Sequence, residues 1–202
     1  MNKLALTFSV LLLSNWNGVV GQTSSFYYTD PRDNQPYAIV KIANTWWFAE
    51  NLNFYTKSSV SFSDASIKSG EWGRHYTFEE KNAVYPPGWR LPGLREWQQL
   101  GSIIQLSGVF AFMDGRLWHR NKHADNSSGL SLLPSGFKHK RRWSHQYFNA
   151  SYWFYEPSQT EKNWHLHIDG ENNMDPYYFH EHENEVYKRR FTIRCVCEKL
   201  PQ

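Results

Sequence analysis

Histidines at alternate positions in the last third of the chain have the spacing that metal chemistry needs. His165, His167 and Asp169 would share one face of a predicted strand, and His180 and His182 repeat the spacing in the next aromatic run. If the two strands pair, four imidazoles approach one another, which predicts a site for zinc or another transition metal. The alternative is a polar sheet face and a solvated loop, because alternation by itself repeats some polar residue type.

Aromatic side chains are the second group with binding chemistry. The chain has 10 Trp, 12 Tyr and 13 Phe residues. Flat rings can stack on sugar faces or fill a core that is short of aliphatic residues. The apolar alternation around Trp153 and Trp164 predicts that these two are buried. The candidates for ligand contact in the later half are Trp143, Tyr147, Tyr155, Tyr177 and Tyr178.

A basic run lies directly before Trp143. Its cationic members are Lys138, Lys140, Arg141 and Arg142, and a second run spans residues 188–190. Such a surface can hold an anionic polymer, either an acidic polysaccharide or lipid headgroups. The alternative is a charged hairpin tip that discourages edge-to-edge strand pairing.

Catalytic patterns and nucleic-acid patterns are both missing from the sequence. It has no Gly-x-Ser-x-Gly nucleophile elbow and no glycine-rich phosphate loop. We therefore expect no enzyme activity and no cofactor, apart from the zinc considered above. The formal charge is +3. This near balance argues against a dedicated nucleic-acid partner.

The first 21 residues read as a signal peptide. Met1-Asn2-Lys3 is a positive start, Leu4 to Leu13 is mostly apolar, and Gly21 closes a stretch of small residues. About ten apolar residues are too few to span a bilayer, so a membrane anchor is the weaker alternative. We expect cleavage near Gly21, which lowers the charge from +3 to about +2 because Lys3 is lost. The remaining residues 22–202 form one predicted domain that is periplasmic, at the cell surface or secreted, and is not an integral membrane protein.

The elements that must position these residues predict an α+β fold. Residues 37–42 and 46–48 predict a β-hairpin, and residues 74–83 predict a short helix. A second helix is expected from Gly93 to about residue 106, and strands are expected at 152–155, 164–168, 177–179 and 191–197. Helices early and strands late, without regular alternation, favour α+β.

The stretch from Pro86 to Trp97 is the most constrained part of the chain. Its three prolines keep residues 86–92 extended. We expect Trp89 and Trp97 to anchor the following helix in the core. Arg90 and Glu96, close across the turn, are candidates for a structural ion pair.

Several of these segments, in the same order, resemble the signatures of the Fibrobacter succinogenes major paralogous domain family. The matching segments lie at residues 40–53, 86–97, 133–137, 152–154 and 193–196. The resemblance implies an exported or surface domain of bacteria, generally without an assigned activity. It also implies a C-type-lectin-like fold, with early helices, a twisted antiparallel sheet, and long irregular loops in the later half that carry ligand contacts. The related formylglycine-generating enzymes need a pair of active-site cysteines, and this activity does not carry over to Cys195 and Cys197.

One departure from the family pattern concerns the cysteines. The family commonly has a cysteine where this chain has Tyr85, and that cysteine would pair with Cys195. Since it is absent, we expect no disulfide within the chain. Cys195 and Cys197 are then free, or paired with another chain, because a bridge between them would close a strained ring.

The function that best fits these features is an exported, noncatalytic binding module for a glycan or protein at the cell envelope, with its binding loops between about residues 116 and 190. One alternative is a structural subunit of a bacterial envelope assembly. Another is a metal-dependent enzyme that uses the histidine strands.

Overall fold

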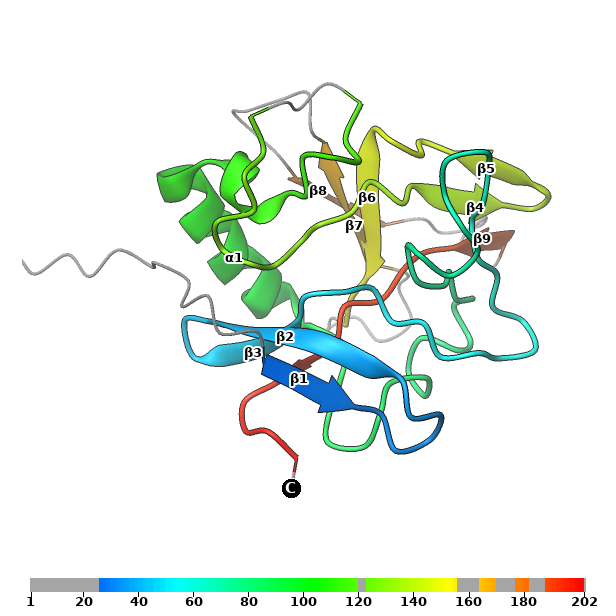
Figure 1. Ribbon diagram of the computed structural model, residues 1–202, viewed down its shortest axis with the longest axis horizontal. Coiled ribbons are helices and arrows are strands. Elements are labelled where there is room, and N and C mark those ends of the chain that lie inside the picture. The colour runs from blue at the N-terminus through cyan, green and yellow to red at the C-terminus, as the bar shows by residue number, and fades with distance from the viewer. Residues whose placement is uncertain (1–25, 120–122, 156–163, 170–176, 182–187, 202) are drawn as a thin grey trace, which may run out of the picture.

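The first sheet joins the two ends of the domain. The computed structural model describes residues 26–119, 123–155, 164–169, 177–181 and 188–201; within these, Gln105, Trp164, His165, Asp169 and residues 177–181 are described by their backbone alone. The sheet has the order β1 (Phe26–Thr29), β2 (Pro36–Ile42), β3 (Thr45–Phe48) and β10 (Val196–Cys197), all antiparallel. The hairpin expected from the sequence is confirmed as β2–β3. In Figure 1 the red C-terminal segment crosses to the blue N-terminal strands.

Helix α1 (Leu94–Ser107) follows the proline-rich stretch, as expected, and ends at Gly108 with a φ of 82°. A short 3-10 helix, η1 (Val109–Phe112), continues from it. The buried side of α1 includes Trp97, Leu100 and Ile104, whose spacing places them on one helix face. Trp97 packs against rings of the first and third sheets, with centroids 5.0 Å from Trp47 and 5.3 Å from Tyr152.

Two further antiparallel sheets of three strands each complete the described structure (Figure 1). One has the order β5 (Arg142–Ser144), β4 (Phe137–His139) and β9 (Arg189–Arg190). The other has the order β6 (Asn149–Trp153), β7 (Trp164–Asp169) and β8 (Tyr177–Glu181). The two sheets touch through single bridges, such as Gly136 with Ala150.

The prediction of a helix at residues 74–83 is wrong. Tyr76 exchanges two backbone hydrogen bonds with Phe191, and His75 does so with Val60. Thr77 and Glu80 cap a turn reciprocally, as they would at a helix start, but no helix continues from it. The long-range pairing satisfies the backbone groups that a local helix would have used.

The strand expected at residues 191–197 is divided. Phe191 bridges to Tyr76, Thr192 bridges to Tyr152, and only β10 joins the first sheet. Strand β1 has no counterpart among the sequence predictions, because the polar residues around it resembled a loop.

Both faces of the first sheet are covered by hydrophobic core clusters. One cluster lies between α1, Trp47 of this sheet, and residues of β6 and β7. The second cluster covers the opposite face with Tyr37, Phe48, Trp89 and Trp153. The fold class is therefore α+β, with one α-helix in the described residues where early helices were expected. No helix of this described part is long and apolar enough to cross a membrane.

Candidate functional site

The β5–β4–β9 sheet brings two basic runs together, and we call it the basic sheet. Lys138 of β4 lies opposite Arg190 of β9, and the N–H of Lys140 donates to the carbonyl of Lys188 at 3.0 Å. These runs are about 50 residues apart in sequence, and together they hold about a third of the 22 lysine and arginine residues. The basic sheet thus concentrates positive charge in a chain whose net charge is nearly balanced.

The tip of the β4–β5 hairpin presents its cations to solvent. Residues 140–141 connect the strands, with a φ of 54° at Lys140, and both Arg141 and Arg142 are exposed. Gly136, before β4, has a φ of 55°, and a Cβ there would lie 2.2 Å from the carbonyl oxygen of Ser144, so only glycine fits. His139, Lys140, Arg141 and Arg142 line a hollow of about 470 Å³ at this tip.

Trp143, a predicted ligand residue, supports the hairpin. Its indole lies against Phe62 and His75, with ring centroids 5.3 Å and 4.8 Å away. The Nζ of Lys138 lies 4.8 Å from the indole centroid, a cation–π contact. Trp143 therefore orients the Lys138 cation, and its predicted contact with a ligand stays a prediction.

Tyr147, a second predicted ligand residue, links two loops. Its hydroxyl donates to Asp64 at 2.5 Å and lies 2.8 Å from Ser66 Oγ. Hydrogen bonds from Tyr147 and from the N–H groups of Ser66 and Ile67 lower the pKa of Asp64 to about 2. Its ring packs 5.0 Å from Trp72. The Tyr147 hydroxyl is therefore committed to a structural contact.

The other predicted aromatic residues lie elsewhere. Tyr155 is 42% exposed, but its backbone pairs with Pro92 and Leu94 at the start of α1 and not with the basic sheet. The backbones of Tyr177 and Tyr178 lie in β8, opposite Ile168 and His167. Trp153 is fully buried, as expected.

The histidine strands do pair. His165 of β7 lies directly opposite His180 of β8, whereas His182 is outside the described residues. His167 Nδ1 lies 2.7 Å from Ser151 Oγ, and its ring packs near Phe137 and Phe191. Within the side chains that the structure describes, no group of three or more His, Cys, Asp or Glu is placed to hold a metal ion. The zinc site therefore stays a prediction.

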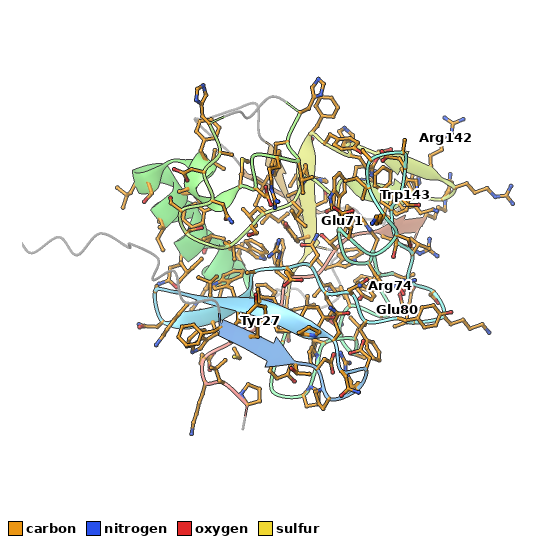
Figure 2. The ribbon with its side chains drawn as sticks, in the orientation of Figure 1. Tyr27, Glu71, Arg74, Glu80, Arg142 and Trp143 are labelled. Atoms are coloured by element: carbon orange, nitrogen blue, oxygen red, sulfur yellow. The ribbon has the colours of Figure 1, made fainter. Side chains whose placement is uncertain are left out.

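Two residues beside the basic sheet were not singled out in the sequence. Tyr55 is 69% exposed, and the guanidinium of Arg74 lies 5.0 Å from its ring centroid. Figure 2 shows Arg74 on the same side of the molecule as Arg142 and Trp143. The sequence feature that could have identified Tyr55 is its place in a polar loop, two positions before Lys57.

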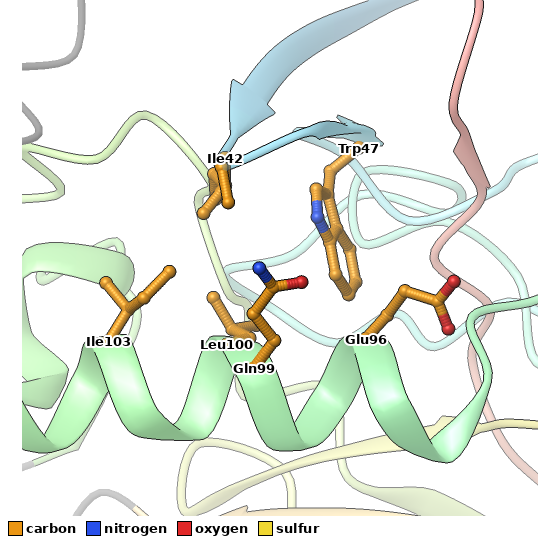
Figure 3. Close-up of a pocket in the computed structure, with 7 residues that line it drawn as sticks. Ile42, Trp47, Glu96, Gln99, Leu100 and Ile103 are labelled. Carbon is orange, nitrogen blue, oxygen red and sulfur yellow. The ribbon is translucent and has the colours of Figure 1, made fainter.

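The proline-rich stretch is scaffold. Trp89 and Trp97 are buried, and Arg90 Nη2 lies 2.5 Å from Glu96 Oε1 and 2.7 Å from Glu198 Oε1. Glu96 lies at the gap between α1 and the turn of the first hairpin, beside Ile42 and Trp47 (Figure 3). This gap is too narrow to admit a water molecule, so it offers no ligand pocket.

Both cysteines are free and buried in the second core cluster, to which Tyr85 also packs. Burial raises the pKa of the Cys195 thiol well above its usual range and that of Cys197 to about 11. Both thiols are therefore held in the protonated, unreactive form.

Comparison with known proteins gives one match. The family model described as the Fibrobacter succinogenes major domain matches residues 40–197. No curated protein and no solved structure matches the chain.

Proposed function

We propose a binding function for this chain, which belongs to the Fibrobacter succinogenes major domain family. The chain acts as an exported, noncatalytic module that recognises a glycan at the bacterial cell surface, and its architecture is C-type-lectin-like. Support for that architecture comes from the first sheet, where β10 pairs with β3 of the N-terminal hairpin, and from the irregular connections in the later half.

The observation that carries the proposal is the register of the basic sheet. Pairing of Lys138 with Arg190 joins two cationic runs in one small sheet, and Arg141 and Arg142 are exposed at its hairpin tip. A hairpin that only blocked edge pairing would not need a second basic strand beside it. A concentrated positive surface in a nearly neutral protein favours an anionic partner.

A glycan array tests this proposal. We expect specific binding by the wild-type protein and its loss in the double variant Arg141→Ser/Arg142→Ser. Arg95→Ser is the matched control, because Arg95 is an exposed arginine on α1, outside the basic sheet. A silent array, with a correctly folded protein, would rule out glycan binding.

A structural subunit of an envelope assembly is the second candidate, and strand β1 favours it. This strand is at the edge of the first sheet, where Phe26 is 48% and Tyr27 is 64% exposed. Exposed edges and exposed rings are common sites of contact with another chain. A stable complex seen by native mass spectrometry of envelope extracts, lost in Tyr27→Ser, would favour this candidate.

A further inference from the structure

We propose that strand β1 binds a second copy of this chain, in a symmetric dimer whose two β1 strands pair antiparallel. This surface belongs to the first sheet, so the inference goes beyond the glycan binding proposed for the basic sheet. Each copy contributes the same strand, as two-fold symmetry requires.

Two residues of β1 point their backbone groups away from β2. Ala38 of β2 turns its backbone toward β3, because its carbonyl accepts the N–H of Ala49 at 2.7 Å and its N–H donates to the Glu50 carboxylate. Tyr27 lies opposite Ala38, so this pair exchanges no hydrogen bonds and the N–H and C=O of Tyr27 face the outer edge of the sheet. The backbone groups of Thr29, two residues further along β1, face the same edge.

The two edges of the first sheet differ. Beyond β10, the backbones of Arg90 and Val196 exchange two hydrogen bonds, at 3.0 and 2.9 Å. At the other edge, no strand of the described part of the chain lies beside β1. Pairing through β1 would therefore join two sheets at their open edges and leave each far edge covered, which gives a closed dimer and not a fibre.

The sequence of β1 leaves its edge unprotected. Charged residues or proline usually protect an edge strand from pairing, and β1 (Phe26–Thr29) has neither. Phe26 is 48% exposed and Tyr27, labelled in Figure 2, is 64% exposed. By contrast β5, at an edge of the basic sheet, begins with the exposed Arg142. This difference favours β1 as the strand that accepts another chain.

The outward-facing residues select one register for the dimer. Tyr27 would pair with the partner's Thr29 and Thr29 with the partner's Tyr27, which makes four backbone hydrogen bonds. Tyr28 would then lie beside the two-fold axis. All four bonds come from residues of β1 itself, so two identical strands satisfy each other.

The charges at the two ends of β1 also fit a second copy. Lys41 of β2 is exposed and lies toward the N-terminal end of β1. The turn that follows the C-terminal end of β1 carries Asp30, Arg32 and Asp33, whose formal charges sum to −1. Antiparallel pairing brings the Lys41 end of each copy toward the acidic turn of its partner, whereas parallel pairing would bring like charges together.

Sedimentation equilibrium of the purified protein tests the dimer. Four hydrogen bonds make a small contact, so we expect a dissociation constant between about 1 μM and about 1 mM. Tyr27→Pro removes an N–H that faces the partner and not β2, so it should keep the fold and weaken the dimer by about tenfold or more. Tyr27→Thr keeps that N–H and should weaken the dimer less. Thermal melts of both variants check that they are folded.

Two further comparisons test the charges and the register. Lys41→Glu should weaken the dimer, whereas Lys57→Glu, at an exposed lysine outside the first sheet, should not. Hydrogen-bonded partners have Cα atoms about 5.5 Å apart, within reach of a disulfide. Mild oxidation of a mixture of the Tyr27→Cys and Thr29→Cys proteins should therefore give a covalent dimer, and neither protein alone should do so.

Several results would overturn the inference. A protein that stays monomeric up to about 1 mM would exclude the dimer. A dimer that Tyr27→Pro leaves unchanged would place the contact on another surface. Oxidative linkage of the Tyr27→Cys protein alone would contradict the register. A monomeric purified protein that binds a different envelope protein through β1 would mean that the edge serves another partner.

Discussion

Arg194 is the largest charged side chain that is fully buried in the described part of the chain. Its side chain is fully buried and donates to Asn51 Oδ1 at 2.8 Å and to the carbonyls of Phe48, Leu130 and Ser131 at 2.6 to 2.9 Å. A guanidinium can bond several carbonyls at once because its donors are fixed in one plane. Arg194 thereby ties the first hairpin to the loop at residues 130–131.

Replacement of Arg194 should therefore be costly. We expect Arg194→Met to lower the free energy of unfolding by about 3–5 kcal/mol, since buried carbonyls lose their donors. Arg95→Met on the exposed side of α1 should change it by less than about 0.5 kcal/mol. Urea denaturation measures both. A similar small loss for both variants would mean that Arg194 is not a central contact.

His75 should make stability depend on pH. Its ring is buried against Trp143, and Nε2 lies 3.1 Å from the carbonyl oxygen of Ser135. Burial lowers the pKa of His75 from 6.5 to about 4. The unfolded chain takes up a proton below pH 6.5 and the folded chain only below about pH 4. Stability from this residue is thus complete above pH 6.5 and is lost, by roughly 3 kcal/mol, as the pH falls to 4.

The variant His75→Gln keeps a donor for Ser135 and removes this titration. We expect a smaller loss of unfolding free energy than in the wild type between about pH 7 and about pH 4.5. His119→Gln, at an exposed position, should retain the wild-type loss. An unchanged loss in His75→Gln would show that other groups cause the acid sensitivity.

At the scale of an element, the start of α1 depends on Glu96. Its carboxylate accepts the N–H of Gly93 at 2.7 Å and pairs with Arg90. Burial raises the pKa of Glu96, but Arg90 and the Gly93 N–H outweigh it, so the pKa is below its usual value. The carboxylate therefore stabilises the fold above its ordinary pKa of 4.5, and this contribution is lost as acid protonates it.

Glu96→Gln should lower the free energy of unfolding by about 1 kcal/mol near neutral pH. Glu198 bonds the same arginine but its side chain is 77% exposed, so Glu198→Gln should have little effect. Thermal melts of the two variants give the comparison. Equal losses would assign the effect to the Arg90 pair and not to the helix start.

Local patterns predicted the elements whose partners are close in sequence. The strand-like composition of residues 37–42 and 46–48 predicted the hairpin, and the prolines before Leu94 predicted the start of α1. The same reasoning failed for residues 74–83, because the backbone of His75 pairs with Val60 and that of Tyr76 pairs with Phe191. A local helix signal cannot reveal a partner that lies more than a hundred residues away.

The residue types of the candidate site could be predicted from the sequence, but their spatial arrangement could not. Each basic run was visible in the sequence, whereas the pairing of Lys138 with Arg190 is a product of the fold. Trp143 was a reasonable choice for stacking on a sugar, but Lys138 lies over its ring. In the sequence Tyr55 is an isolated tyrosine in a polar loop, and only the fold places the Arg74 guanidinium beside its ring.

At the scale of the whole molecule, the C-terminal segment completes the fold. The N–H groups of Phe48 and Leu52 donate to the carbonyls of Cys195 and Ile193, both at 2.9 Å. We expect a chain that ends after Phe191 to lose its cooperative unfolding transition in calorimetry, because both core clusters lose members. Removal of residues 201–202 alone is the control and should leave the transition in place. A cooperative transition in the shorter chain would show that the segment is dispensable.

The place of β10 beside β3 also sets an order of events during synthesis. Trp46 and Trp47 are made about 150 residues before their neighbours Cys197 and Val196. Contacts this distant in sequence are slow to form and cannot begin before both partners exist. The first sheet therefore stays incomplete, with one edge of β3 unpaired, until β10 has emerged from the ribosome.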